Sequence, residues 1–117
     1  MSIEKMYSAF RENAIIAASA FLQGDSKTNK AATKKMDNAF KKIEASGESM
    51  QAFYDVMVRD ENVYVRLQAI TYCGNTKYNI AWALTEIKKM RSNCELTDLD
   101  RLTIDFAINR WEKELKG

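Results

Sequence analysis

The chain has 117 residues, of which 46% are hydrophobic and 29% are charged, and its net charge is +2. This composition is typical of one small soluble domain and excludes a disordered chain. Because the chain contains no histidine, no proline and only four glycines, it lacks groups for histidine-based catalysis and has few residues for the turns of a β-sandwich or barrel.

The N-terminal part of the chain predicts two helices. Between Ser2 and Gly24, apolar residues recur at steps of three and four, which places them on one helix face. They are Ile3, Met6, Phe10, Ala14, Ala17 and Phe21. Ser2 can cap the start of this helix and Gly24 can end it. A second helix runs to about Ser46, is stopped by Gly47, and carries Ala32, Met36, Ala39, Phe40 and Ile43 on its inner face.

The middle of the chain predicts two shorter helices. One covers residues 48–59, with Phe53, Val56 and Met57 directed inward. The other covers residues 63–73 after the turn at Asp60–Asn62, and Gly74 is expected to end it. It is apolar on two faces, with Val63, Leu67 and Ile70 on one and Val65, Ala69 and Tyr72 on the other. Because a helix that is apolar on both sides packs between neighbours, we expect Leu67 in the core.

The C-terminal part predicts two further helices. The first begins at Asn75 or Thr76, ends at about Met90, and has Ile80, Leu84 and Ile87 inward. The last ends at about Leu115, and Thr97 with Asp100 resembles a capping box at its start. This helix has two apolar stripes, Leu99, Leu102 and Phe106 on one side and Ile104, Ile108, Trp111 and Leu115 on the other. The pattern leaves open whether the second stripe packs within the monomer or on a second copy.

Two resemblances to known proteins extend these predictions. The segment Asp60–Ile70 resembles the turn and second helix of a HEAT repeat, with Asp60, Val65, Arg66 and Ala69 matching in order. The layout of residues 48–115, with Leu84–Ile87 and Trp111, resembles a family of small bacterial helical-repeat proteins. These are similar to immunity proteins encoded beside polymorphic or contact-dependent toxins. The resemblance implies an all-α fold of five to six antiparallel helices, stacked as a short HEAT-like superhelix. It implies one domain over residues 1–117, with the HEAT-like unit at about 48–90.

The resemblance and the missing catalytic groups together predict a cytoplasmic protein that is not an enzyme. It would bind a cognate bacterial toxin, a nuclease, one to one and occlude its active site. A nuclease cleft is basic and needs an acidic complement, while exposed aromatic side chains supply affinity. The candidate partner-binding residues are Asp60, Glu61, Tyr78, Trp82, Glu95, Asp98, Asp100 and Asp105. We expect no cofactor, metal site, catalytic residue or membrane partner, and a homodimer remains open.

The alternative function is nucleic-acid binding by a lysine ridge on the second helix. Lys27, Lys30, Lys34 and Lys41 fall on one side of that helix, flanked by Lys35 and Lys42, and such a row could follow phosphates. Because no arginine fork or aromatic interleaving accompanies the ridge, the sequence favours a protein partner. Cys73 and Cys94 lack metal-ligand spacing, and we expect both to be reduced thiols. Whether Tyr78 and Trp82 are exposed or covered by a further helix is also open.

Overall fold

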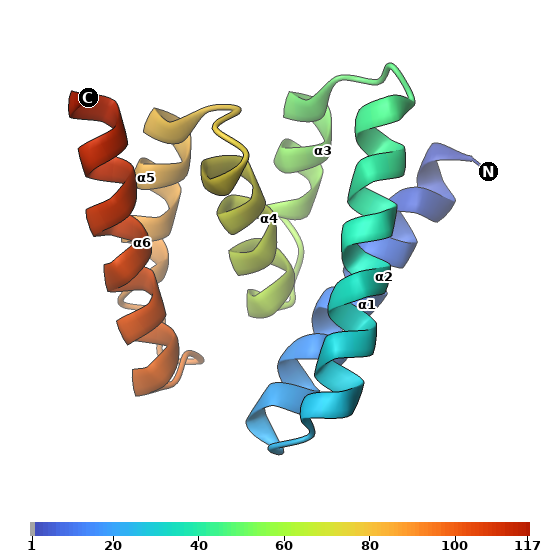
Figure 1. The fold of residues 1–117 in the computed structure, drawn as a ribbon, viewed down its shortest axis with the longest axis horizontal. Coiled ribbons are helices and arrows are strands. Elements are labelled where there is room, and N and C mark those ends of the chain that lie inside the picture. Colours follow the sequence, from blue (N-terminus) through green and yellow to red (C-terminus); the bar gives the residue numbers. More distant parts are fainter. Residues whose placement is uncertain (1) are drawn as a thin grey trace. The chain divides into compact units, whose positions relative to one another are not determined.

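The computed structural model describes residues 2–117, and all regular structure in that range is helical, which confirms the predicted all-α class (Figure 1). The helices are α1 (Ile3–Leu22), α2 (Ser26–Ala45), α3 (Met50–Met57), α4 (Val63–Asn75), α5 (Ile80–Met90) and α6 (Asp98–Lys116). The chain forms two compact units, one up to Val65 and one from Arg66 to Gly117. The HEAT-like stacking, the single domain and the repeat unit at residues 48–90 remain predictions.

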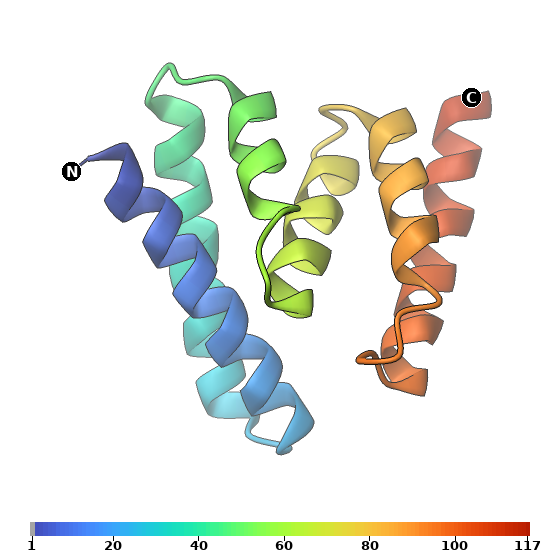
Figure 2. The same cartoon turned by 180° about the vertical axis from the view of Figure 1, so that it is seen from behind.

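In the first unit, α1 and α2 lie side by side and run in opposite directions (Figures 1 and 2). The connection is short because α1 ends in a left-handed glycine, Gly24, with φ +74. The N–H groups of Gly24 and Asp25 donate to Phe21 and Ala20, which satisfies carbonyls at the end of α1. The Asp25 side chain then accepts from Thr28 N–H and caps α2. All five residues predicted for the inner face of α2 are buried, as expected.

An aromatic cluster forms the core of the first unit. The Phe53 ring on α3 makes edge contacts with the rings of Phe10, Phe40, Tyr7 and Tyr54, at centroid distances of 5.0, 5.9, 5.3 and 5.3 Å. Edge-to-face contacts of this kind are favourable beyond the area they bury. The cluster therefore joins α3 to the α1–α2 pair.

Two side chains predicted to face inward in the first unit do not. Phe21 on α1 is 51% exposed and Val56 on α3 is 52% exposed. Phe21 lies in the last turn of α1, next to the loop. Although it belongs to the apolar stripe, no neighbouring element covers its side chain there. On α3 the buried residue next to Phe53 is Tyr54, at 0% exposure, and this residue was missed because its hydroxyl makes it a poor core candidate.

In the second unit, α5 and α6 lie side by side and antiparallel (Figures 1 and 2). At one end, the Arg91 guanidinium donates to both oxygens of Asp105 at 2.6 and 2.9 Å. Arg101 donates to the carbonyls of Arg91 and Asn93, at 3.2 Å each, and so satisfies carbonyl groups where α5 ends. At the other end, the Lys77 ammonium lies 3.5 Å from Glu114. The capping box of Thr97 and Asp100 is present, which confirms the predicted start of α6.

The prediction that Gly74 ends the fourth helix is wrong. Gly74 lies inside α4, which continues to Asn75, and its backbone packs directly against the Trp111 indole of α6. Trp111 is 0% exposed, and its indole N–H donates to the Asn75 side chain at 3.1 Å. The glycine is therefore needed for close packing. Leu67, expected in the core, is only half-buried, whereas Ile70 on the same predicted stripe is buried.

The turn between α4 and α5 is closed by a lysine in a conformation that usually belongs to glycine. Lys77 has φ +60. Its N–H donates to Gly74, and the N–H of Tyr78 donates to Cys73, which is the Schellman pattern of helix termination. These two hydrogen bonds close the turn that follows α4, so α5 begins only at Ile80. The predicted start at Asn75 or Thr76 is wrong.

Replacing Lys77 with glycine is expected to stabilise the protein by about 0.5–1 kcal/mol, because a side chain in the left-handed region costs about 1–2 kcal/mol and glycine has no such cost. The lost ion pair with Glu114 is exposed and offsets little of this. Urea denaturation followed by circular dichroism measures the change, and the control is Lys34→Gly, in the interior of α2, which should destabilise by a similar amount.

Candidate protein-binding surfaces

The predicted binding residues are divided between the two units. Asp60 and Glu61 belong to the first unit, and the other six belong to the second. Asp60 is held by Arg11, whose guanidinium donates to both of its oxygens at 2.5 and 3.3 Å, and this contact raises the pKa of Arg11. Asp60 also accepts from the Asn62 N–H at 2.8 Å, inside the turn before α4. Its carboxylate is therefore engaged inside the protein, whereas Glu61 is exposed.

The acidic candidates of the second unit are also largely engaged. Arg91 pairs with Asp105 and lowers the pKa of that carboxyl group, chiefly through the hydrogen bond. Asp98 lies 3.1 Å from Arg101, and Asp100 accepts from the Thr97 N–H in the capping box. Glu95 is exposed, and no ion pair of residues 2–117 includes it. Most of these carboxylates therefore form contacts that stabilise the α5–α6 connection and the start of α6. They leave less uncompensated negative charge for a partner than the number of acidic residues suggested.

The two aromatic candidates lie at the start of α5. Tyr78 is 48% exposed and Trp82, in the first turn, is half-buried. Between them, Asn79 caps the helix by accepting from the Trp82 N–H at 3.1 Å. The capped turn before Tyr78 and the capped helix after it fix the backbone that carries both rings. This end of α5 thus presents an ordered aromatic surface, which answers the question that the sequence left open for Tyr78.

The aromatic and acidic candidates of the second unit lie at opposite ends of the α5–α6 pair. The start of α5 lies beside the end of α6, where Lys77 meets Glu114, while Arg91 meets Asp105 at the other end. The 11 residues of α5 span about 16 Å at 1.5 Å per residue. The structure therefore does not gather Tyr78 and Trp82 into one patch with Glu95, Asp98 and Asp100.

A third surface is the outer face of α6. Leu99, Leu102 and Phe106 are 50%, 50% and 63% exposed, so this stripe is not used in the core. The opposite stripe behaves differently, because Ile104 and Trp111 are buried. Leu115, at the end of that second stripe, is exposed. The stripe of Leu99, Leu102 and Phe106, hereafter the α6 row, was recognised in the sequence, but its exposure was not predicted.

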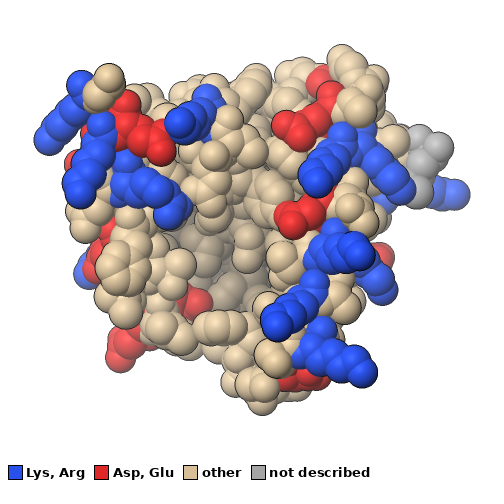
Figure 3. Space-filling model, in the orientation of Figure 1, with Lys and Arg blue, Asp and Glu red and all other residues tan. Residues whose placement is uncertain are grey.

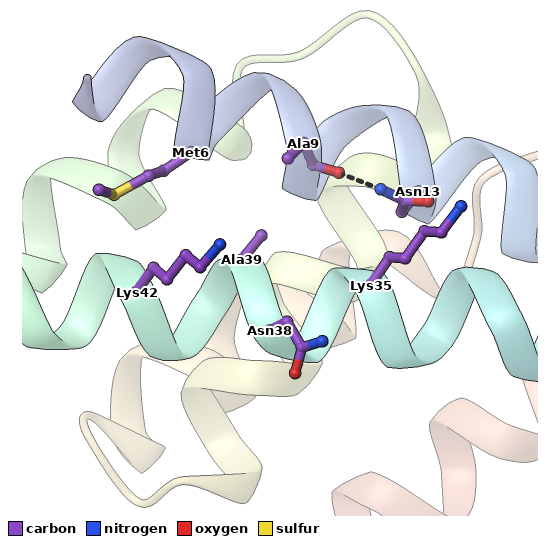
Figure 4. Close-up of a pocket in the computed structure, with 7 residues that line it drawn as sticks. All are labelled: Met6, Ala9, Asn13, Lys35, Asn38, Ala39 and Lys42. Carbon is purple, nitrogen blue, oxygen red and sulfur yellow. Dashed lines mark hydrogen bonds between the residues drawn. The ribbon is translucent and has the colours of Figure 1, made fainter. Parts of the chain in front are cut away.

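The lysine face of α2 is exposed throughout, as Figure 3 shows for the basic side chains along that helix. Between α2 and α1 lies a shallow groove of about 260 Å³. Figure 4 shows Lys35 and Lys42, at two places along α2, extending toward α1, and Asn13 on α1 turned toward the carbonyl of Ala9 (2.8 Å). The face is positive and accessible, and it has no arginine, because all basic residues of α2 are lysines.

The buried Cys73 is not an activated thiol. Cys73 is buried, and burial raises the pKa of its thiol to about 11, while Cys94 is exposed. Within residues 2–117, no three His, Cys, Asp or Glu side chains are grouped so that they could hold a metal ion.

Across residues 2–117 we find no helix with the length and apolar character that a bilayer span requires. Comparison of the chain with protein-family models, with curated protein sequences and with solved structures found no match.

Proposed function

We propose that this chain is a binding protein that neutralises a bacterial toxin in the cytoplasm by covering the toxin's active site. The observation that supports this most is the aromatic surface at the start of α5, where Tyr78 is 48% exposed beside Trp82. Tyrosine and tryptophan are the residues most enriched among those that dominate binding energy at protein interfaces. The HEAT-like resemblance and the absence of histidine point to the same function.

The local structure favours tight binding because it orders this surface before any partner arrives. The hydrogen bond from Tyr78 N–H to Cys73 closes the preceding turn, and the Asn79 cap fixes the following one. An ordered surface loses less conformational entropy on association than a mobile loop. The left-handed Lys77 immediately before Tyr78 is consistent with a functional demand on this turn, because such conformations are costly and cluster at functional sites.

Charge plays a smaller part in this proposal than the sequence suggested. Asp60, Asp98 and Asp105 each contact an arginine of the same chain, so their charges are partly compensated. Glu61 also lies 3.9 Å from Arg11, so the exposed Glu95 is the main acidic side chain left to attract a basic toxin surface. Such rim charges mainly accelerate encounter and contribute little to affinity.

Trp82→Ala is expected to weaken binding of the toxin domain encoded by the neighbouring gene by about 30-fold, or 2 kcal/mol, mainly through faster dissociation. Surface plasmon resonance with the purified toxin domain measures both rates. Val56→Ala removes an exposed apolar side chain elsewhere and is the matched control, expected to bind like wild type. Unchanged dissociation rates for both Trp82→Ala and Tyr78→Ala would contradict the proposal.

A second candidate function is nucleic-acid binding by α2, and the exposed lysine face favours it. The six lysines of α2 outnumber its two acidic residues, Asp37 and Glu44. The triple variant Lys30→Glu, Lys34→Glu, Lys41→Glu separates the two functions. Toxin binding that stays within about tenfold of wild type supports the aromatic surface, whereas a steeply salt-dependent affinity for RNA or DNA that this variant abolishes supports the second function.

A further inference from the structure

The outer face of α6 carries three kinds of side chain in succession. Asp98 is exposed at its start, directly after the exposed Glu95 of the preceding loop; the α6 row follows, and Lys113 and Lys116 are exposed at its end. Figure 3 shows mainly acidic side chains at the lower left, over the start of α6, and mainly basic ones at the upper left, over its end. This order suits the dipole of the helix itself, but the dipole does not account for the apolar row in the middle.

The α6 row has the geometry of a packing face. At 100° per residue, Leu99, Leu102 and Phe106 fall within about 60° of one another around the helix. Steps of three and four residues are those of a seam between two helices. Each of the three is half or more exposed, whereas the core of the second unit is filled by other residues such as Ile104 and Trp111. The row therefore contributes little to the fold of the single chain.

We propose that two copies of this chain pair through the α6 row, with the two α6 helices antiparallel about a two-fold axis. In an antiparallel two-fold pair, a residue near the start of α6 on one copy meets a residue near the end of α6 on its partner. Asp98 of each copy then lies against Lys113 of the other. A parallel pairing would instead place acidic ends together and basic ends together, which like-charge repulsion disfavours.

The register of the row agrees with this pairing. Around the helix axis, Asp98 and Lys113 are rotated from the centre of the row by about 70° and 10°, in the same direction. In an antiparallel pair, residues that are rotated in the same direction on the two helices lie on the same side of the interface. If the two-fold axis passes midway between Leu102 and Phe106, Asp98 and the Lys113 that it meets are offset by about three residues, roughly 4.5 Å along the axis. The long Lys113 side chain can take up this difference because helical side chains lean toward the N-terminus.

Self-association goes beyond the proposed function, since it uses a different surface from Tyr78 and Trp82. An interface of one helix face per copy lies at the small end of specific interfaces. We therefore expect a reversible dimer that is seen between about 1 µM and 1 mM protein. Either property can fail without the other, because toxin binding is measured with Trp82→Ala and dimerisation with variants of α6.

Sedimentation velocity across this concentration range tests the apolar part of the interface. Wild type should shift from monomer to dimer, and Phe106→Asp should raise the dimer dissociation constant by at least about tenfold. Val56→Asp places the same charge at an exposed apolar residue of the first unit and should dimerise like wild type. A wild-type chain that remains monomeric up to about 1 mM would overturn the proposal and leave the row to a different partner.

A charge exchange tests the antiparallel register. Asp98→Lys and Lys113→Glu should each weaken the dimer several-fold, and the double variant should return to within about threefold of wild type. Lys41→Glu on α2 is the control for the change in net charge. If Asp98→Lys acted only by weakening the start of α6, adding Lys113→Glu would not restore the dimer. That outcome, with normal circular dichroism, would overturn the antiparallel pairing.

Discussion

Replacing Phe53 with alanine is expected to lower the free energy of unfolding by about 4 kcal/mol. Phe53 is 0% exposed and lies within 5.9 Å, centroid to centroid, of the four other rings of the cluster. Its removal leaves a cavity and also removes the edge contacts that join α3 to α1 and α2. Urea denaturation followed by circular dichroism measures the loss.

Phe21→Ala is the matched control for Phe53→Ala, because it makes the same change at a side chain that is 51% exposed. We expect it to alter the free energy of unfolding by less than about 0.5 kcal/mol. Equal effects of the two substitutions would show that the aromatic cluster is not the core of the first unit.

Replacing Gly74 with alanine is expected to cost about 2–3 kcal/mol, even though alanine favours helices over glycine by about 1 kcal/mol. An added Cβ would overlap several atoms of the Trp111 ring. The ring is completely buried and bonded to Asn75, so α4 and α6 must move apart to relieve the overlap. Thermal and urea unfolding both report the change.

The overlap between Gly74 and Trp111 can be isolated with a double-mutant cycle. Trp111→Phe makes room for the added methyl group, so the cost of Gly74→Ala should fall by at least about 1 kcal/mol in that background. Gly47→Ala is the control, since no atom lies within 4 Å of its Cβ position; its cost is the backbone strain at φ +81, about 1 kcal/mol. Strict additivity of Gly74→Ala and Trp111→Phe would contradict the packing explanation.

The helix pattern and several helix ends were predictable because they depend on neighbouring residues. Ser2, Gly24 and Gly47 end or begin helices where the sequence placed them. The capping box of Thr97 and Asp100 is also formed within one turn of the chain. Caps and periodicity act over three or four residues, so no knowledge of distant contacts was needed.

The errors share a different cause, which is packing between elements. Gly74 resembled a helix end, but it lies inside α4, and a ring from residue 111 needs the space that the glycine leaves. Phe21 and Val56 continue an apolar stripe, yet their positions lie where no neighbouring element covers them. Periodicity identifies the face of a helix that turns inward, but the elements that pack against that face decide how much of it is buried.

For the candidate binding surfaces, too, some features follow from the local sequence and others only from packing between elements. The sequence by itself determined which side chains carry charge or aromatic rings, that histidine chemistry is absent, and that α6 has two apolar stripes. Only the tertiary structure decided that Arg11 pairs with Asp60 and Arg91 with Asp105, and that the α6 row is the exposed stripe. The physical reason is that ion pairs such as Arg11 with Asp60 join residues far apart in the chain, and burial depends on what packs against each face.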